Sequence, residues 1–122
     1  MSKEIKRYFT HNLDKGNQAL FTIPNNISFA QIDDMRVLLD TSYTDEVQEV
    51  IFSLWAVDNS GKIIARFFPN NYIIETQGTQ TFVCFDTYIQ IPAGSTIFTN
   101  VDGNYRNNGG SVKIATSVEI FN

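Results

Sequence analysis

Hydrophobic and polar residues alternate along most of this chain, and the strongest pattern lies in residues 50–68. Two apolar runs there flank a four-residue turn, DNSG at residues 58–61. Such residues hydrogen-bond their own backbone or adopt a positive φ at little cost. The first run is apolar at both odd and even positions, which is typical of a strand covered on both faces. The pattern therefore predicts a β-hairpin at the centre of an antiparallel core.

The same period of two predicts further strands on both sides of this hairpin. They cover residues 5–13, 18–24, 34–41, 72–76, 79–91, 95–101 and 111–121. Turns rich in Pro, Asn and Gly separate them at the spacing of an all-β sandwich or barrel. Residues 27–33 fit either a short helical turn or an irregular crossing, and residues 44–49 are the other helical candidate. The chain is predicted to be all-β, a single antiparallel β-sandwich of about eight strands over residues 1–122.

Composition and charge narrow the function classes. A chain of 122 residues can bury one core but not two, and its 10 Phe and 5 Tyr supply large apolar areas. A net charge of −4 with scattered cations disfavours binding to nucleic acid. No apolar run is long enough to be a transmembrane segment, and the N-terminus lacks the apolar core of a secretory signal. We therefore expect a protein that is made in a cytoplasm.

Few residues suit catalysis. His11 and Cys84 are the single histidine and cysteine, and no third group stands out to orient a Cys–His pair. Cys84 lies in a strand-like run, so we expect a buried, inert thiol. Asp33, Asp34 and Asp40 are candidates for a metal site or paired carboxylates, although loop acids that solvate the entry to a strand are commoner. The sequence predicts no enzyme, no catalytic residue, no metal site and no cofactor.

Several strands carry a second apolar face, which a two-layer sandwich leaves outside. The candidate interface residues on these faces are Trp55, Phe68, Phe82 and Tyr88. Exposed apolar patches beyond a few hundred Å² usually mark an interface, so this surplus predicts self-assembly. Residues 1–8, with Lys3, Lys6 and Arg7, are a candidate N-terminal arm that reaches a neighbouring subunit. A fraying terminus is the alternative.

The chain resembles the small single jelly-roll proteins of virus and phage particles, including vertex (penton) and decoration proteins. The resemblance lies in its length, its eight or so strands, and two segments in which short strands meet Pro, Asn and Gly corners: SLWAVDNSGKIIARFFPNN and YIQIPAGSTIFTN. It implies a jelly roll and a non-enzymatic role in a capsid. It also implies a symmetric homo-oligomer, a pentamer for a vertex protein, with other capsid proteins as partners. The location it implies is the virion, assembled in the host cytoplasm.

The alternative is a carbohydrate- or receptor-binding jelly-roll module. Tyr rings stack on sugars, and Asn amides hydrogen-bond their hydroxyl groups. The Gly/Asn-rich loop at residues 102–110 supplies the candidate ligand residues Asn104, Tyr105, Asn107 and Asn108, with Tyr43 and Tyr72 as further candidates. Asn-rich turns also form without any ligand, because Asn tolerates a left-handed backbone. A cupin-like enzyme is disfavoured, since one histidine cannot supply the metal ligands of such a site.

Overall fold

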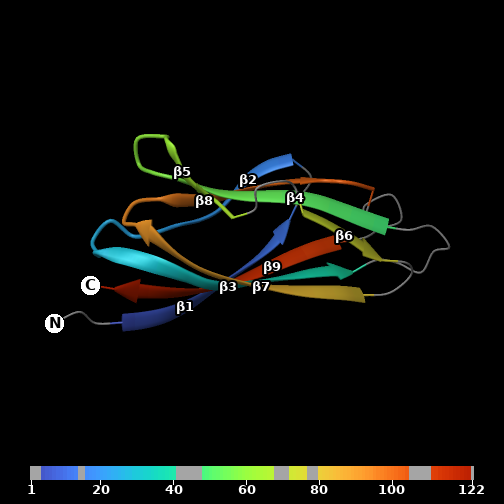
Figure 1. Cartoon of the computed structure of the whole chain (residues 1–122), viewed down its shortest axis with the longest axis horizontal. Coiled ribbons are helices and arrows are strands. Elements are labelled where there is room, and N and C mark those ends of the chain that lie inside the picture. Colours follow the sequence, from blue (N-terminus) through green and yellow to red (C-terminus); the bar gives the residue numbers. More distant parts are fainter. Residues whose placement is uncertain are drawn as a thin grey trace.

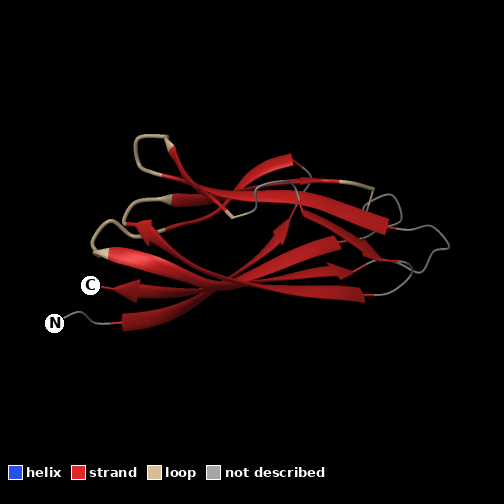
Figure 2. Ribbon diagram, viewed as in Figure 1, coloured by secondary structure: helices blue, strands red, loops and turns tan. Residues whose placement is uncertain are grey.

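The computed structural model describes residues 4–13, 16–40, 48–67, 72–76, 80–104 and 111–121. These residues form strands connected by turns, with no helix among them, as Figure 2 shows. No helix that could span a membrane occurs in this described part of the chain. The strands are β1 (Glu4–Leu13), β2 (Gly16–Thr22), β3 (Phe29–Asp40), β4 (Gln48–Val57), β5 (Ile63–Arg66), β6 (Tyr72–Thr76), β7 (Gln80–Pro92), β8 (Thr96–Asp102) and β9 (Ser111–Phe121). The all-β prediction is confirmed.

The strands form two antiparallel sheets that lie one above the other (Figure 1). The first sheet has the order β1-β9-β3-β7. The second sheet has the order β2-β8-β4-β5, and β6 also pairs with β4, next to β5. The pairs are nested along the chain: β1 with β9, β2 with β8, β3 with β7, and β4 with β5 and β6. This order is that of a long hairpin rolled into two layers, so the sandwich is a jelly roll.

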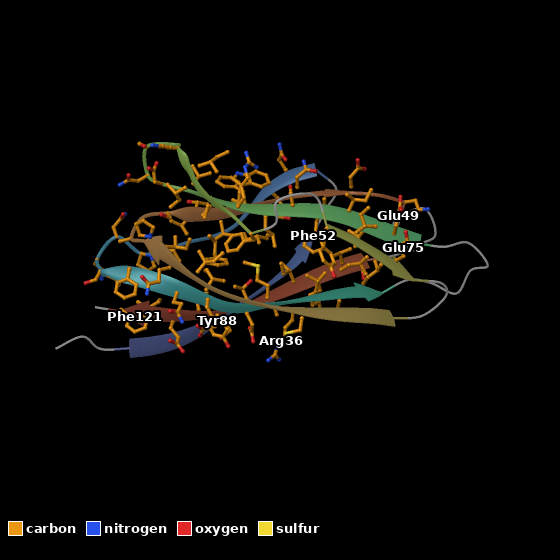
Figure 3. The ribbon with its side chains drawn as sticks, in the orientation of Figure 1. Arg36, Glu49, Phe52, Glu75, Tyr88 and Phe121 are labelled. Carbon is orange, nitrogen blue, oxygen red and sulfur yellow. The ribbon has the colours of Figure 1, made fainter. Side chains whose placement is uncertain are left out.

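The core fills the space between the two sheets. On β4 the even-numbered side chains point inward, and Phe52 and Leu54 are almost fully buried there. Figure 3 shows Phe52 between the layers, where its ring lies 5.6 Å from that of Tyr72. Other fully buried side chains come from both sheets: Ile32, Met35, Val37, Leu39, Ile91, Ile97 and Ile114. Alternation along β4, β8 and β9 thus places one apolar face of each strand in the core, as the sequence predicts.

The predicted central hairpin is confirmed as β4, β5 and the turn between them. The Asp58 carboxylate accepts hydrogen bonds from the Ser60 hydroxyl at 2.7 Å, the Ser60 amide at 2.9 Å and the Lys62 amide at 3.0 Å. These bonds, led by that of the Ser60 hydroxyl, hold the pKa of Asp58 below its usual value. Gly61 adopts the positive φ of 89° that closes the turn. The Asp58 side chain therefore stabilises the turn by hydrogen bonds to Ser60 and Lys62.

Residues 27–33, which the sequence left between a helical turn and an irregular crossing, belong partly to a strand. β3 begins at Phe29 and runs without a break to Asp40. Its register with β9 pairs Ile32 with Val118 and Asp34 with Ser117, so Asp33 is an extra residue in a β-bulge. The bulge moves the inward face of β3 from even-numbered to odd-numbered residues, which hides the strand period.

The N-terminal segment belongs to the first sheet from Glu4 onward. Residues 4–8 form the first half of β1 and pair with residues 117–121 of β9. β1 is an edge strand of the first sheet. Residues 1–3 lie outside the described residues, and the arm stays a prediction.

Candidate functional site

The two described members of the predicted interface lie on opposite outer faces of the sandwich. Trp55 is half-buried on the outer face of the second sheet, because its neighbours Leu54 and Ala56 point into the core. Its ring stacks on that of Phe98 from β8, with ring centres 5.9 Å apart. Tyr88 lies on the outer face of the first sheet (Figure 3), where 66% of it is exposed.

The other two predicted interface residues cannot be added to either face. Phe68 lies outside the described residues. The backbone of Phe82 in β7 pairs with that of Leu38 in β3, and the Phe82 side chain lies outside the part that the structure describes. The four residues therefore do not form a single described patch, and their role in an interface stays a prediction.

The outer face of the second sheet carries several exposed or half-buried apolar side chains among the described residues. Its outward positions on β4 alternate with the buried ones, and β5, β6 and β8 continue the same surface across the sheet. Its apolar members are Ile51, Trp55, Val57, Ile63, Ile73 and Phe98. Ile73 is 54% exposed and Ile63 is 44% exposed, a large fraction for branched aliphatic side chains. We call this surface the apolar face.

Opposite charges lie at the two ends of the apolar face. At one end Glu49 of β4 is paired directly with Glu75 of β6, and Figure 3 shows the two side by side. Like charges directly opposite one another in an antiparallel pair destabilise the sheet. Toward the other end Arg66 of β5 is paired with Trp55. Within the described residues, none of these three charged side chains forms an ion pair.

Polar and charged side chains lie around the bulge of β3 in the first sheet. Gln31 donates a hydrogen bond of 2.7 Å to the Asp33 carboxylate, and Arg36 lies 3.5 Å from the Asp34 carboxylate. A depression of about 50 Å³ is lined by Asp34, Arg36, Ala115, Thr116 and Ser117. Asp33 and Asp34 are thus at a bulge inside a strand, and the expectation that they are loop acids at a strand entry is wrong.

The expectation for Cys84 is also wrong, because its thiol is exposed. Val37 of β3 points into the core and pairs with Val83, which turns the next residue of β7 outward. β9 and β3 lie between β1, which carries His11, and β7, which carries Cys84. Three strand spacings separate the two backbones, about 14 Å, which is too far for a Cys–His pair. The part of the chain that the structure describes holds no group of three or more residues able to bind a metal.

The predicted ligand loop is described only at its start. Asn104 has a hydrogen-bond partner within the chain, since its side-chain oxygen accepts a hydrogen bond of 2.8 Å from the Glu49 amide. The remaining members, Tyr105, Asn107 and Asn108, lie outside the described residues, as does Tyr43. Tyr72 packs against the core beside Phe52, so its ring is not a free platform for a sugar.

Sequence comparison identifies no relative: neither a family model nor a curated protein matches the chain. Solved structures do match in fold, and the following three come from viruses or phages. A chain from the acid-stable capsid of Helicobacter pylori bacteriophage KHP30 is 14% identical, with a TM-score of 0.52 over 100% of this chain and 94% of that chain. A chain of infectious bursal disease virus, Gt strain, is 13% identical, with a TM-score of 0.47 over 98% of this chain. Turnip yellow mosaic virus contributes a chain with 8% identity and a TM-score of 0.47, over 98% of this chain and 81% of that chain.

The likeness to the KHP30 capsid chain supports the jelly-roll fold that the strand order shows. The chain spans only 32% of the bursal disease virus chain. The KHP30 capsid chain, in contrast, is matched over nearly its whole length. The resemblance to single jelly-roll virion proteins is therefore confirmed at the level of the fold.

The residues that sequence reasoning missed are Glu49, Arg66 and Ile73. Their arrangement depends on which residues face one another across β4, β5 and β6. Only the high apolar content of residues 72–74 signalled that this segment contributes to a surface.

Proposed function

We propose that this chain is a non-enzymatic structural subunit of a virus or phage particle. It assembles with copies of itself, and with other capsid proteins, through the faces and edges of its sandwich. The observation that most supports the proposal is the match to the KHP30 capsid chain, which covers nearly all of both chains. A single jelly roll of the same extent can occupy the same kind of place in a shell.

The apolar face supports the same proposal from the chemistry of the chain. Monomeric proteins rarely expose large contiguous apolar surfaces, because such surfaces favour association. Here two isoleucines, Ile63 and Ile73, are about half exposed beside the stacked Trp55 and Phe98. A subunit that is buried among copies in a shell makes use of such a surface.

The finer proposals concern the place of the subunit in the particle. We propose a vertex (penton) or decoration role, with a pentamer as the symmetric unit and the virion as the location. Trp55, Phe68, Phe82 and Tyr88 remain the proposed contact residues. Residues 1–8 are proposed to contact a neighbour, in keeping with the position of β1 at the edge of the first sheet.

The carbohydrate-binding alternative has less support. Of its candidate residues, the two that the structure describes are used within the chain, Asn104 by the Glu49 amide and Tyr72 by the core. A glycan module would depend on Tyr105, Asn107 and Asn108, which lie outside the described residues.

Electron microscopy of the purified protein in negative stain tests the proposed function. We expect rings or closed shells of uniform size at high protein concentration. A field without particles, together with specific binding to an immobilised glycan that is lost on Tyr105→Ala, would favour the alternative instead.

A further inference from the structure

The apolar face combines three features that need a partner outside the chain. Its centre is apolar and half-exposed, and its two ends carry opposite charges with no ion pair among the described residues. No described strand lies beyond this sheet in Figure 1, so no described strand covers the face. The Glu49–Glu75 pair is unfavourable until a cation approaches it.

The edges of the second sheet are poorly suited to pairing with another sheet. β2 contains an irregularity between Ala19 and Phe21. On the other side of β4, β5 covers only residues 63–66 and β6 only residues 72–76. Bulged and short edge strands hinder the addition of a further strand. The face is therefore the better contact surface of this sheet.

The charges of the face are arranged to complement a second copy of the same face. β5 and β6 lie end to end along the same side of β4, with Arg66 on β5 and Glu75 on β6. A two-fold axis that lies in the contact plane and crosses the strands near Ser53 places β5 of one copy over β6 of the other. Arg66 of each copy then approaches Glu75 and Glu49 of its partner. The same rotation places Ile51 over Trp55 and Ile73 over Arg66, while Phe98 lies over Asp102.

We propose that the apolar face binds a second copy of this chain across a two-fold axis. This proposal specifies one contact within the proposed assembly. It rests on the proposed function only in taking the partner to be a second copy of this chain. Each pair buries two identical apolar faces and neutralises two Glu49–Glu75 pairs, one in each copy. A closed, isologous contact of this kind uses the same surface on both subunits.

Charge exchange between two variants tests the proposal, with sedimentation velocity as the measurement. In Arg66→Glu both ends of the face are negative. In Glu49→Gln/Glu75→Arg both ends are positive, and the first substitution prevents Glu49 from neutralising the new arginine. Each variant alone should dimerise at least about tenfold more weakly than the wild type, because two symmetric contacts change from attraction to repulsion. An equimolar mixture of the two variants should recover a heterodimer, which also shows that both are folded.

Lys113→Glu is the matched control. Lys113 is exposed on the first sheet, and its reversal changes the net charge by the same amount as Arg66→Glu. It should dimerise as the wild type does. Equal weakening by both reversals, no recovery in the mixture, or a wild type that stays monomeric would each overturn the proposal.

Failure of this inference is distinguishable from failure of the assembly role. A higher oligomer that is insensitive to all these substitutions would overturn the two-fold contact and leave the assembly role standing. Pairs that follow the charge exchange but never form rings or shells under the electron microscope would support the contact and contradict the assembly role.

Discussion

Replacing Phe52 with alanine should lower the free energy of unfolding by about 3–5 kcal/mol, the usual cost for a buried phenylalanine. Only 2% of Phe52 is exposed, and it lies between the sheets in contact with the ring of Tyr72. Its removal therefore loses most of the transfer free energy of the ring and leaves a cavity. At about 0.05–0.15 kcal/mol per residue, a chain of 122 residues is stable by about 6–18 kcal/mol. The variant should thus lose a large fraction of its stability.

Urea denaturation followed by fluorescence measures this loss, as a lower midpoint at an unchanged slope. Ile51→Ala is the matched control, since Ile51 is the preceding residue of β4 and is half-buried on the outer face. It should cost about 1 kcal/mol, because less apolar area is lost and no closed cavity forms. Equal costs for the two variants would refute the assignment of inner and outer faces on β4.

Four further variants test local features of the fold. Asp58→Asn should unfold more readily than the wild type at neutral pH and lose less stability on acidification. Because folding lowers the pKa of Asp58, the ionised carboxylate stabilises the folded state above its ordinary pKa of about 4, and this stabilisation is lost as the pH falls through the lower pKa of the folded state. Parallel plots of stability against pH for the variant and the wild type would contradict this expectation. Gly103→Ala should cost at least about 2 kcal/mol, since the new Cβ would lie 2.5 Å from the Glu49 carbonyl oxygen at a φ of 111°. Gly61→Ala, with open space around it at a φ of 89°, should cost only about 1 kcal/mol; equal melting temperatures for the two would show that the contact is absent. Tyr88→Gly should raise stability by up to about 1 kcal/mol, because Tyr88 is exposed and adopts a φ of 50°, and a clear loss on thermal unfolding would contradict this.

The alternation of polar and apolar residues predicts the strands of this chain but not their order. Residues 111–121 show the point: the pattern identifies a strand with one buried face, and β9 has that face. Nothing in the pattern says that this last strand lies between β1 and β3. Periodicity fixes which side chains share a face, whereas the neighbours of a strand follow from long-range pairing.

Bulges and double-sided apolar strands account for the other differences. The extra residue Asp33 interrupts the alternation within β3, so a continuous strand appears to be two segments. In β7 both Val83 and Cys84 lie in an apolar run, so the sequence alone does not show that Cys84 is exposed. The charge pattern of the apolar face depends on register in the same way, because Glu49 and Glu75 meet only through the pairing of β4 with β6.

The absolute mass of the wild-type protein in solution tests the central claim of assembly most directly. Light scattering over a concentration series should give a discrete mass that is a whole-number multiple of 13.8 kDa. This mass should grow with concentration only until a closed oligomer is reached. A constant mass of one chain up to the highest concentration would contradict self-assembly through the sandwich faces.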